Sequence, residues 1–323
     1  MKKSVAAVIT LAGLGAVGMG AAYGTYRLAF YSSPKRKENV HEIPPGEQYE
    51  KSGAIMHALI SEMEDLPYEQ IYITAHDGLK LAGRYYHVKD GAPLQIQCHG
   101  YRGTALRDFC GGNKLARELG HNTIVIDQRA HGKSEGKTIS FGIKERYDCL
   151  DWINYANERF GDDIPIILSG VSMGAATVLM ASELDLPDNV VGIVADSPYS
   201  TPEAIIRKVC GDMKINHKVA YPFVRLGADV FGHLKLSEAD PVRAVKNAKV
   251  PIMIIHGEDD RFVPCEMSNE ILGSSPKYVV RETFPQAGHA ISFMEDPERY
   301  TELTGNFMEK CINDYYKKNK VTG

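Results

Sequence analysis

A serine lies between two glycines at the point where an apolar run gives way to a helical pattern. The residues Gly170–Gly174 have the pattern G-x-S-x-G, with the apolar run Ile164–Ser169 before them and Ala175–Leu179 after them. A sharp turn between a strand and a helix exposes the serine hydroxyl, and the first turn of the helix offers free N–H groups to a developing negative charge. Ser172 is therefore predicted to be the nucleophile of an acyl-transfer reaction.

A serine hydroxyl is a weak nucleophile at neutral pH and needs a base, which in turn needs an acid to orient it. Both residue types follow later apolar runs. The run 250–256 leads into three carboxylates, Glu258, Asp259 and Asp260, and His289 comes after the last apolar run. Because the carboxyl ends of parallel strands meet at one edge of a sheet, these groups can converge on the serine.

Three further histidines, His99, His131 and His256, compete for the role of base. His99 and His256 each precede a glycine at the end of an apolar run, where a hydrogen bond that supports the turn is the expected role. His289 alone follows the final run, and it is the predicted base because the chain order is then serine, aspartate, histidine.

Several other motifs accompany the serine. They are His99-Gly100-Tyr101-Arg102-Gly103, Asp127-Gln128-Arg129-Ala130-His131-Gly132-Lys133-Ser134, Asp196-Ser197-Pro198-Tyr199 and the D-x-x-V-P that ends at Pro264. Together with G-x-S-x-G, they resemble the α/β-hydrolase superfamily over about residues 65–318, and most of all bacterial serine hydrolases similar to esterases and serine aminopeptidases. Ala130 departs from the glycine that is usual in the D-x-R-G-x-G-x-S turn of that superfamily.

The resemblance implies further roles. The residue after His-Gly and the residue after the nucleophile would donate the two oxyanion N–H groups, and these are Tyr101 and Met173. The D-x-x-V-P spacing selects Asp260 as the acid, with Asp259 and Glu258 as alternatives. A serine at the nucleophile position, in place of aspartate, excludes the haloalkane dehalogenases and epoxide hydrolases of this fold. No metal and no organic cofactor is implied.

Short apolar runs alternate with helical patterns through most of the chain. Two runs predict an antiparallel hairpin, 70–75 and 81–88, and six more predict strands buried on both faces: 94–98, 122–127, 164–169, 190–195, 250–256 and 278–283. Helices are predicted over 112–119, 142–160, 173–184, 266–272 and 297–317. This alternation predicts an α/β fold with a mostly parallel eight-stranded sheet and helices on both faces.

One long connection interrupts this alternation. It holds about 54 residues, between the strand that ends near residue 196 and the strand that begins near residue 250. Since it is rich in aromatic residues, it is predicted to be a helical lid over the carboxyl edge of the sheet, at about 197–249. A helical insert that only packs is the alternative. The expected organisation is an amino-terminal segment at 1–31, a linker and short helix at 32–64, and a hydrolase domain at 65–323.

The amino-terminal segment is apolar, because Lys2 and Lys3 precede 23 uncharged residues, Ser4–Tyr26. A helix of this length can span a bilayer, so a membrane anchor is predicted; a cleaved signal peptide of a secreted protein and a buried helix of a cytoplasmic protein are the alternatives. Basic residues on both flanks leave either orientation open. The G-x-G-x-x-G at Gly13–Gly18 does not predict a dinucleotide site, since the polar segment 32–37 cannot form the buried strand that such a site requires.

Composition excludes other classes of protein. The 323 residues are 44% hydrophobic and 24% charged, as in ordinary globular proteins. A net charge of −4 provides no positive field to gather nucleic acid. The six cysteines are scattered and form no C-x-x-C pair, so a metal site is not predicted, and unpaired thiols suit a reducing compartment.

The sequence therefore predicts a cofactor-independent serine hydrolase that acts on a small-molecule acyl substrate. Carboxylic esters are favoured over peptides, because the predicted lid offers no obvious clamp for an amino-terminal amine beyond Glu203, Asp229 or Glu238. A serine aminopeptidase is the first alternative. A non-catalytic binding protein on the same fold is the second, and it would need a member of the triad to be missing.

Overall fold

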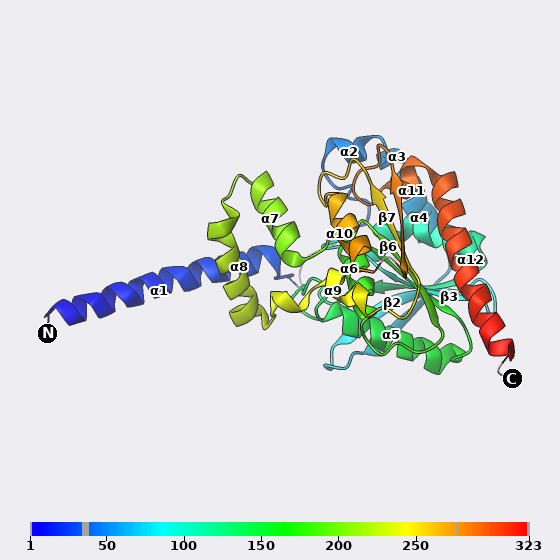
Figure 1. Ribbon diagram of the computed structural model, residues 1–323, viewed down its shortest axis with the longest axis horizontal. Coiled ribbons are helices and arrows are strands. Elements are labelled where there is room, and N and C mark those ends of the chain that lie inside the picture. The colour runs from blue at the N-terminus through cyan, green and yellow to red at the C-terminus, as the bar shows by residue number, and fades with distance from the viewer. Residues whose placement is uncertain (1, 34–38, 276, 322–323) are drawn as a thin grey trace.

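An eight-stranded sheet forms the centre of the protein (Figure 1). The computed structural model describes the backbone of residues 2–33, 39–275 and 277–321, and the side chains of 15–33, 39–275 and 277–320. The strands are β1 (Glu69–Thr74), β2 (Lys80–Tyr86), β3 (Leu94–Cys98), β4 (Asn122–Asp127), β5 (Ile166–Val171), β6 (Val190–Asp196), β7 (Ile252–Gly257) and β8 (Val279–Phe284). Their order is β1-β2-β4-β3-β5-β6-β7-β8. The β1–β2 and β2–β4 pairs are antiparallel and the rest are parallel, so the predicted mostly parallel sheet is confirmed.

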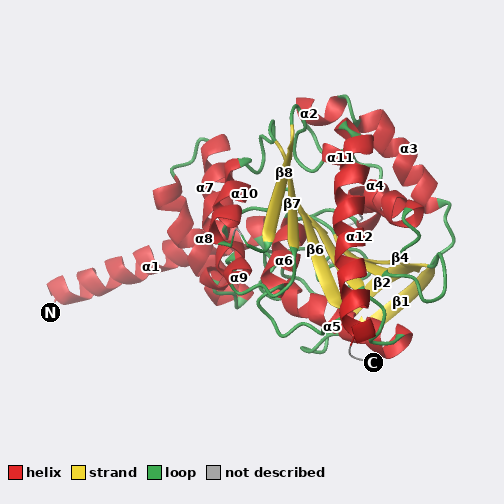
Figure 2. Ribbon diagram, turned by 45° about the vertical axis from the view of Figure 1, so that its right-hand side comes forward, coloured by secondary structure: helices red, strands yellow, loops and turns green. Residues whose placement is uncertain are grey.

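Helices cover both faces of this sheet (Figure 2). One face carries α5 (Glu145–Phe160), α6 (Met173–Ala181), α9 (Pro241–Lys246) and α10 (Glu266–Ser274); the other carries α3 (Gly53–Glu64), α4 (Ala105–Glu118), α11 (Ser292–Glu295) and α12 (Pro297–Val321). Every residue of β3, β6 and β7 is consequently buried, which explains their continuous apolar sequences.

The start of α4 differs from the prediction, which placed it at Gly112. The helix begins at Ala105, because the Thr104 side chain caps it by accepting a hydrogen bond from the Arg107 N–H at 3.1 Å. Gly111 lies inside the helix, where the ring of Phe293 packs so closely that a Cβ would lie 2.4 Å from it. Gly111 therefore serves packing inside the helix.

The insertion between β6 and β7 is helical, as predicted. It consists of α7 (Pro202–Asp212), α8 (His217–Gly232), a 3₁₀ turn at Leu236–Glu238, and α9. The partner of α8 is the amino-terminal helix α1 (Lys2–Ala29): the Thr25 hydroxyl donates to the Phe223 carbonyl at 3.0 Å, and Gly227 lies against the Ala22 carbonyl. Figures 1 and 2 both show the amino-terminal part of α1 projecting away from the sheet, while α8 packs against the carboxyl-terminal part of α1.

The predicted membrane-spanning anchor is not supported. Among the residues that the structure describes, none of the helices combines the length and the apolarity needed to cross a bilayer. Glycines lower the hydropathy of the segment, and its side chains before residue 15 lie outside the described part. In the described part, Ala22, Tyr26 and Phe30 are buried, so this end of α1 packs on the protein.

The expected linker at 32–50 is only partly a linker. Residues 34–38 lie outside the described part of the chain. The segment from residue 39 onward folds against the body: it contains α2 (Glu47–Glu50), buries Tyr49, and leads into α3, the short helix that the sequence predicted. Pro44, Pro45 and the polar composition are consistent with the irregular backbone of this segment, but the segment is packed against the body of the protein.

Candidate active site

The turn between β5 and α6 places Ser172 in a strained conformation. Its φ of 55° and ψ of −114° lie outside the regions that residues with side chains ordinarily adopt. The turn is tight enough that a Cβ on Gly174 would lie 1.8 Å from the Cys98 carbonyl oxygen, and one on Gly170 would lie 2.2 Å from the Gly174 oxygen. Both glycines of G-x-S-x-G are thus required by close backbone approach.

Ser172, His289 and Asp260 form one chain of hydrogen bonds. The Ser172 Oγ lies 2.9 Å from His289 Nε2, and His289 Nδ1 lies 2.7 Å from Asp260 Oδ2. The other carboxylate oxygen of Asp260 accepts the N–H groups of Phe262 and Val263, at 2.9 and 2.8 Å. The side chains of these three residues are buried, and the exclusion of water strengthens their hydrogen bonds.

Asp260 is held as a carboxylate. Burial opposes its ionisation, but the adjacent imidazoles of His289 and His256 outweigh burial and hold the pKa of Asp260 below its usual range. The alternative acids, Glu258 and Asp259, have exposed side chains, and Glu258 is bound to the Thr283 hydroxyl at 2.6 Å. The structure therefore brings only one of these three carboxylates to His289.

The loop that carries His289 is fixed from two sides. The Gln48 side-chain oxygen accepts the His289 N–H at 3.3 Å, and the Ser197 hydroxyl accepts the Ala290 N–H at 3.2 Å. Ser197 in turn is bonded to Asp196 at 2.9 Å. Sequence reasoning noted the Asp-Ser-Pro-Tyr motif but gave no role to Gln48, which lies more than 200 positions from its partner.

The competing histidines support turns. His99 Nε2 accepts the Gln128 N–H at 3.1 Å, and His131 Nε2 accepts the Arg102 N–H at 3.0 Å. His256 Nε2 donates to the Val263 carbonyl at 2.9 Å and lies 3.3 Å from the Asp260 carboxylate.

The loop after β3 lies beside Ser172 and is bonded to three different parts of the chain. The Asp108 carboxylate accepts the Gly100 N–H at 2.8 Å. His131, on the turn after β4, holds the backbone of Arg102. The third attachment is the end of α1, where the Tyr101 hydroxyl donates to the Ala29 carbonyl at 2.9 Å. Met173 follows Ser172 directly and is the first residue of α6.

Comparison with known proteins identifies the family of the chain. The family model described as "Alpha/beta hydrolase family" matches residues 98–303, which include the loop after β3, the serine turn and both other members of the hydrogen-bond chain. The chain belongs to the alpha/beta hydrolase family.

Three similar proteins have low sequence identity to the chain. YqkD of Bacillus subtilis is 22% identical over 263 residues, which cover 80% of this chain and 84% of YqkD. Lysophosphatidylserine lipase ABHD12 of Danio rerio is 23% identical over 187 residues, 55% of this chain, and the chain matches 46% of its length. The structure of the Pyrococcus furiosus esterase Pf2001 has a TM-score of 0.64 at 22% identity, covering 77% of this chain and 93% of that one.

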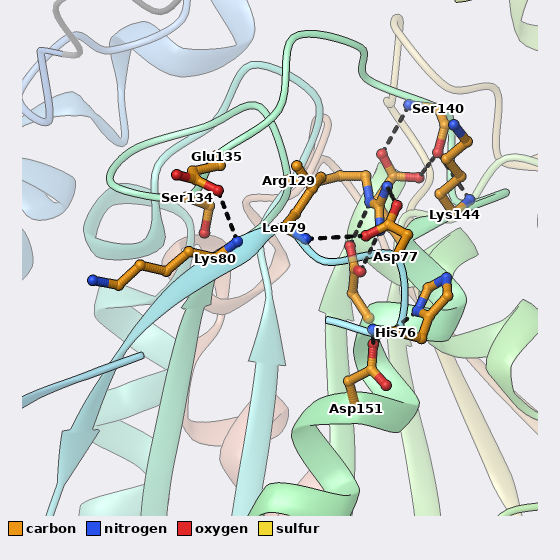
Figure 3. A network of polar contacts seen from close by, with 12 residues as sticks. His76, Asp77, Leu79, Lys80, Arg129, Ser134, Glu135, Ser140, Lys144 and Asp151 are labelled. Carbon is orange, nitrogen blue, oxygen red and sulfur yellow. Dashed lines mark hydrogen bonds and ion pairs between the residues drawn. The ribbon is translucent and has the colours of Figure 1, made fainter. Parts of the chain in front are cut away.

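The turn after β4 shows how an alpha/beta hydrolase motif is held without its usual glycine. Ala130 takes a φ of 65°, the left-handed region that favours glycine. Beside it, Arg129 is buried and binds two carboxylates, Asp148 at 2.6 Å and Asp77 at 2.8 Å (Figure 3). The Lys80 N–H donates to the Glu135 carboxylate at 2.9 Å. These contacts fix the turn that contains His131.

A group that could ligate a metal by residue type also lies in this region, namely His76, Asp148 and Asp151. Its members are already engaged, because Asp148 binds Arg129 and the His76 Nδ1 lies 2.8 Å from the Asp151 carboxylate. The cluster is therefore interpreted as part of the network in Figure 3.

A cavity of about 390 Å³ opens at Ser172 and His289. Its other lining residues come from the segment 42–56, from the loop after β3 and the start of α4, and from positions near His289: Glu42, Pro44, Pro45, Gln48, Tyr49, Met56, Gly100, Tyr101, Arg102, Arg107, Asp108, Val171, Phe262, Ala290 and Met294. None of these lining residues belongs to 197–249. The predicted lid is therefore not confirmed for this cavity, because the segment 42–56 contributes six of its lining residues and the insertion contributes none.

Proposed function

We propose that this alpha/beta hydrolase is a serine hydrolase that cleaves carboxylic esters through an acyl-enzyme. The observation that carries the proposal is the continuous set of hydrogen bonds from Ser172 Oγ through His289 to Asp260. An imidazole whose far nitrogen is bound to a carboxylate presents its near nitrogen as a base to the hydroxyl, which is the arrangement that nucleophilic serine requires.

The reaction then follows from these groups. His289 Nε2 accepts the proton of Ser172 as the hydroxyl oxygen attacks the ester carbonyl, and Asp260 stabilises the imidazolium. The N–H groups of Tyr101 and Met173 bind the oxyanion, each such donor typically contributing about 3 kcal/mol. The imidazolium gives its proton to the departing alcohol, and a water molecule, deprotonated by the same imidazole, releases the acid.

Esters are favoured over peptides by the cavity. The acidic residues that could have clamped a peptide amine, Glu203, Asp229 and Glu238, lie in the insertion, outside the lining. Two acidic residues lie in the lining: Asp108 is engaged by Arg107 at 2.8 Å and by the Gly100 N–H, and Glu42 is close enough to Arg107 to help raise the pKa of its guanidinium. Arg102 and Arg107 in the same lining balance these two charges. Relatives named esterase and lipase support the same choice.

A fluorophosphonate probe tests the proposal. We expect it to label the folded wild-type chain at Ser172, and Ser172→Ala to abolish labelling and to lower kcat/KM for p-nitrophenyl butyrate by a factor on the order of 10⁵ to 10⁶. Ser237→Ala, at an exposed serine of the insertion, is the matched control and should keep both activities. Wild-type protein that is folded but neither labelled nor active would support a binding protein, and faster cleavage of aminoacyl anilides than of esters would support an aminopeptidase.

A further inference from the structure

Tyr49 presents a buried hydroxyl group to the cavity at Ser172. Its side chain lines the cavity, and the residue is only 7% exposed. Three other polar side chains of the lining, those of Gln48, Arg102 and Arg107, each form a hydrogen bond with another part of the protein. Within the described part of the chain, by contrast, nothing forms a hydrogen bond with the Tyr49 hydroxyl. Because a buried phenol ordinarily has a partner, this group is available to a molecule that enters the cavity.

The charges around the Tyr49 hydroxyl favour a neutral acceptor. Burial raises the pKa of Tyr49, and the carboxylates of Asp260 and Asp108 raise it further, against the opposing effect of the Arg107 guanidinium. The hydroxyl therefore stays protonated at neutral pH and can donate a hydrogen bond. Two carboxylates that are close enough to act on it also disfavour an anionic group of a ligand at the same place. The acceptor is therefore expected to be a neutral oxygen.

The helix α2, which carries Tyr49, is attached to the loop of His289. The Gln48 side-chain oxygen accepts the His289 N–H at 3.3 Å, and the Glu47 carboxylate lies 3.3 Å from the Arg261 guanidinium. In the proposed reaction His289 gives its proton to the departing alcohol, so the alcohol part of a bound ester lies beside this imidazole. The attachment of α2 to the same loop places Tyr49 on the alcohol side of the cavity.

We propose that Tyr49 is a specificity-determining residue that donates a hydrogen bond to a neutral oxygen on the alcohol part of the substrate. The preferred substrates are then esters of hydroxylated alcohols, such as ethylene glycol or glycerol, in place of esters of simple alkyl alcohols. The role of Tyr49 rests on the proposed ester hydrolysis and adds the class of alcohol to it. The side chains of Val171 and Phe262 in the same lining offer no hydrogen-bonding atom, so they cannot make this distinction.

Two nearly isosteric esters test the contact. Hydroxyethyl butyrate and propyl butyrate differ by a hydroxyl in place of a methyl group, and titration of the released butyric acid measures the hydrolysis of both. The ratio of kcat/KM, hydroxyethyl over propyl, should fall in Tyr49→Phe by about 2- to 12-fold, which corresponds to one hydrogen bond. Methoxyethyl butyrate, which accepts but cannot donate a hydrogen bond, should lose the same factor relative to butyl butyrate.

Stability separates this role from a structural one. The Tm of Tyr49→Phe should not fall, because the hydroxyl that the variant lacks has no partner among the described residues. Tyr72→Phe, at an exposed tyrosine of β1, is the matched control and should keep both the ratio and the Tm of the wild type. A lower Tm in Tyr49→Phe, with the same loss of kcat/KM for every ester, would make the hydroxyl structural and reject the proposal.

Labelling by the fluorophosphonate probe separates this test from that of the proposed function. An unchanged ratio in a Tyr49→Phe protein that is labelled at Ser172 would reject the role of Tyr49 and leave the hydrolase proposal intact. A folded wild type that is neither labelled nor active would reject the hydrolase proposal and, with it, the role of Tyr49.

Two further esters test the position and charge of the acceptor. If Tyr49→Phe lowers the ratio of propyl β-hydroxybutyrate over propyl butyrate and leaves the ratio for the alcohol unchanged, the contact lies on the acyl part. If the largest loss is for carboxymethyl butyrate, the acceptor is anionic. Either result would overturn the proposal.

Discussion

At the scale of single residues, the candidate site depends on groups that stabilise one another's protonation states. Asp260 has its two oxygens divided between His289 and backbone N–H groups. This division fixes the imidazole with one nitrogen toward the carboxylate and the other toward Ser172. A neutral amide in place of the carboxylate would leave the shape intact while favouring the wrong tautomer of the imidazole.

Asp260→Asn is therefore expected to lower kcat for an ester by a factor on the order of 10⁴ with little change in KM. The matched control is Asp259→Asn, at the neighbouring exposed carboxylate, which should retain wild-type kinetics. A large loss in the Asp259 variant, with activity preserved in the Asp260 variant, would reverse the assignment of the acid.

The same variant gives a pH dependence of stability. Because the pKa of Asp260 is held below its usual range in the folded protein, its ionisation stabilises the fold above the pKa of the unfolded chain, about 3.9, and this contribution is lost as the pH falls toward the folded pKa. The difference in Tm between wild type and Asp260→Asn should thus shrink as the pH falls from about 5 to about 3, measured by thermal unfolding. A difference that grows over this interval would contradict the assigned direction.

At the scale of elements, the sequence predicts well what depends on local pattern. The strands lie near their predicted positions, and β3 to β7 were found because runs buried on both faces must be apolar. The strand β8 was expected to be buried on both faces, but it lies at the edge of the sheet and Val280 is exposed. The serine turn was found because close backbone approach demands both of its glycines. The contacts of Gln48 and Asp108 were missed. Each joins segments through one hydrogen bond or ion pair, and no periodicity in the sequence reports such a contact.

The end of α1 makes a contact of this kind that can be tested. Tyr101→Phe removes the hydrogen bond to the Ala29 carbonyl. A net contribution of about 0.5 to 1.5 kcal/mol from this bond corresponds to a decrease in kcat of about 2- to 12-fold. If α1 positions the loop after β3, which carries the proposed oxyanion donor Tyr101, this decrease should appear in kcat and leave KM and Tm nearly unchanged. Tyr85→Phe, which removes a phenol bond to His87 far from the site, is the control and should not change kcat. An equal loss in both variants, or a change in Tm alone, would contradict a positioning role.

At the scale of the whole molecule, tertiary packing decides which segments line the cavity at Ser172. The helical insertion packs with α1 to one side of the sheet, while the segment 42–56, part of the predicted linker and short helix at 32–64, lines the cavity at Ser172. Composition describes the local backbone of such a segment, but where it packs is decided by tertiary contacts such as that between Gln48 and the His289 loop.

This arrangement predicts that acyl-chain preference depends on the segment 42–56. Met56 is buried and lines the cavity, so Met56→Ala should enlarge it and raise the ratio of kcat/KM for p-nitrophenyl octanoate over acetate by about 10-fold, the lower end of the discrimination that one methylene-sized change can supply. Because truncating a buried methionine also costs stability, the ratio of two substrates within one variant is the readout, and it does not depend on the folded fraction. Met213→Ala makes the same change at an exposed position of the insertion and should leave the ratio at its wild-type value. If the octanoate-to-acetate ratio changes in Met213→Ala and not in Met56→Ala, the insertion and not the segment 42–56 determines acyl-chain preference.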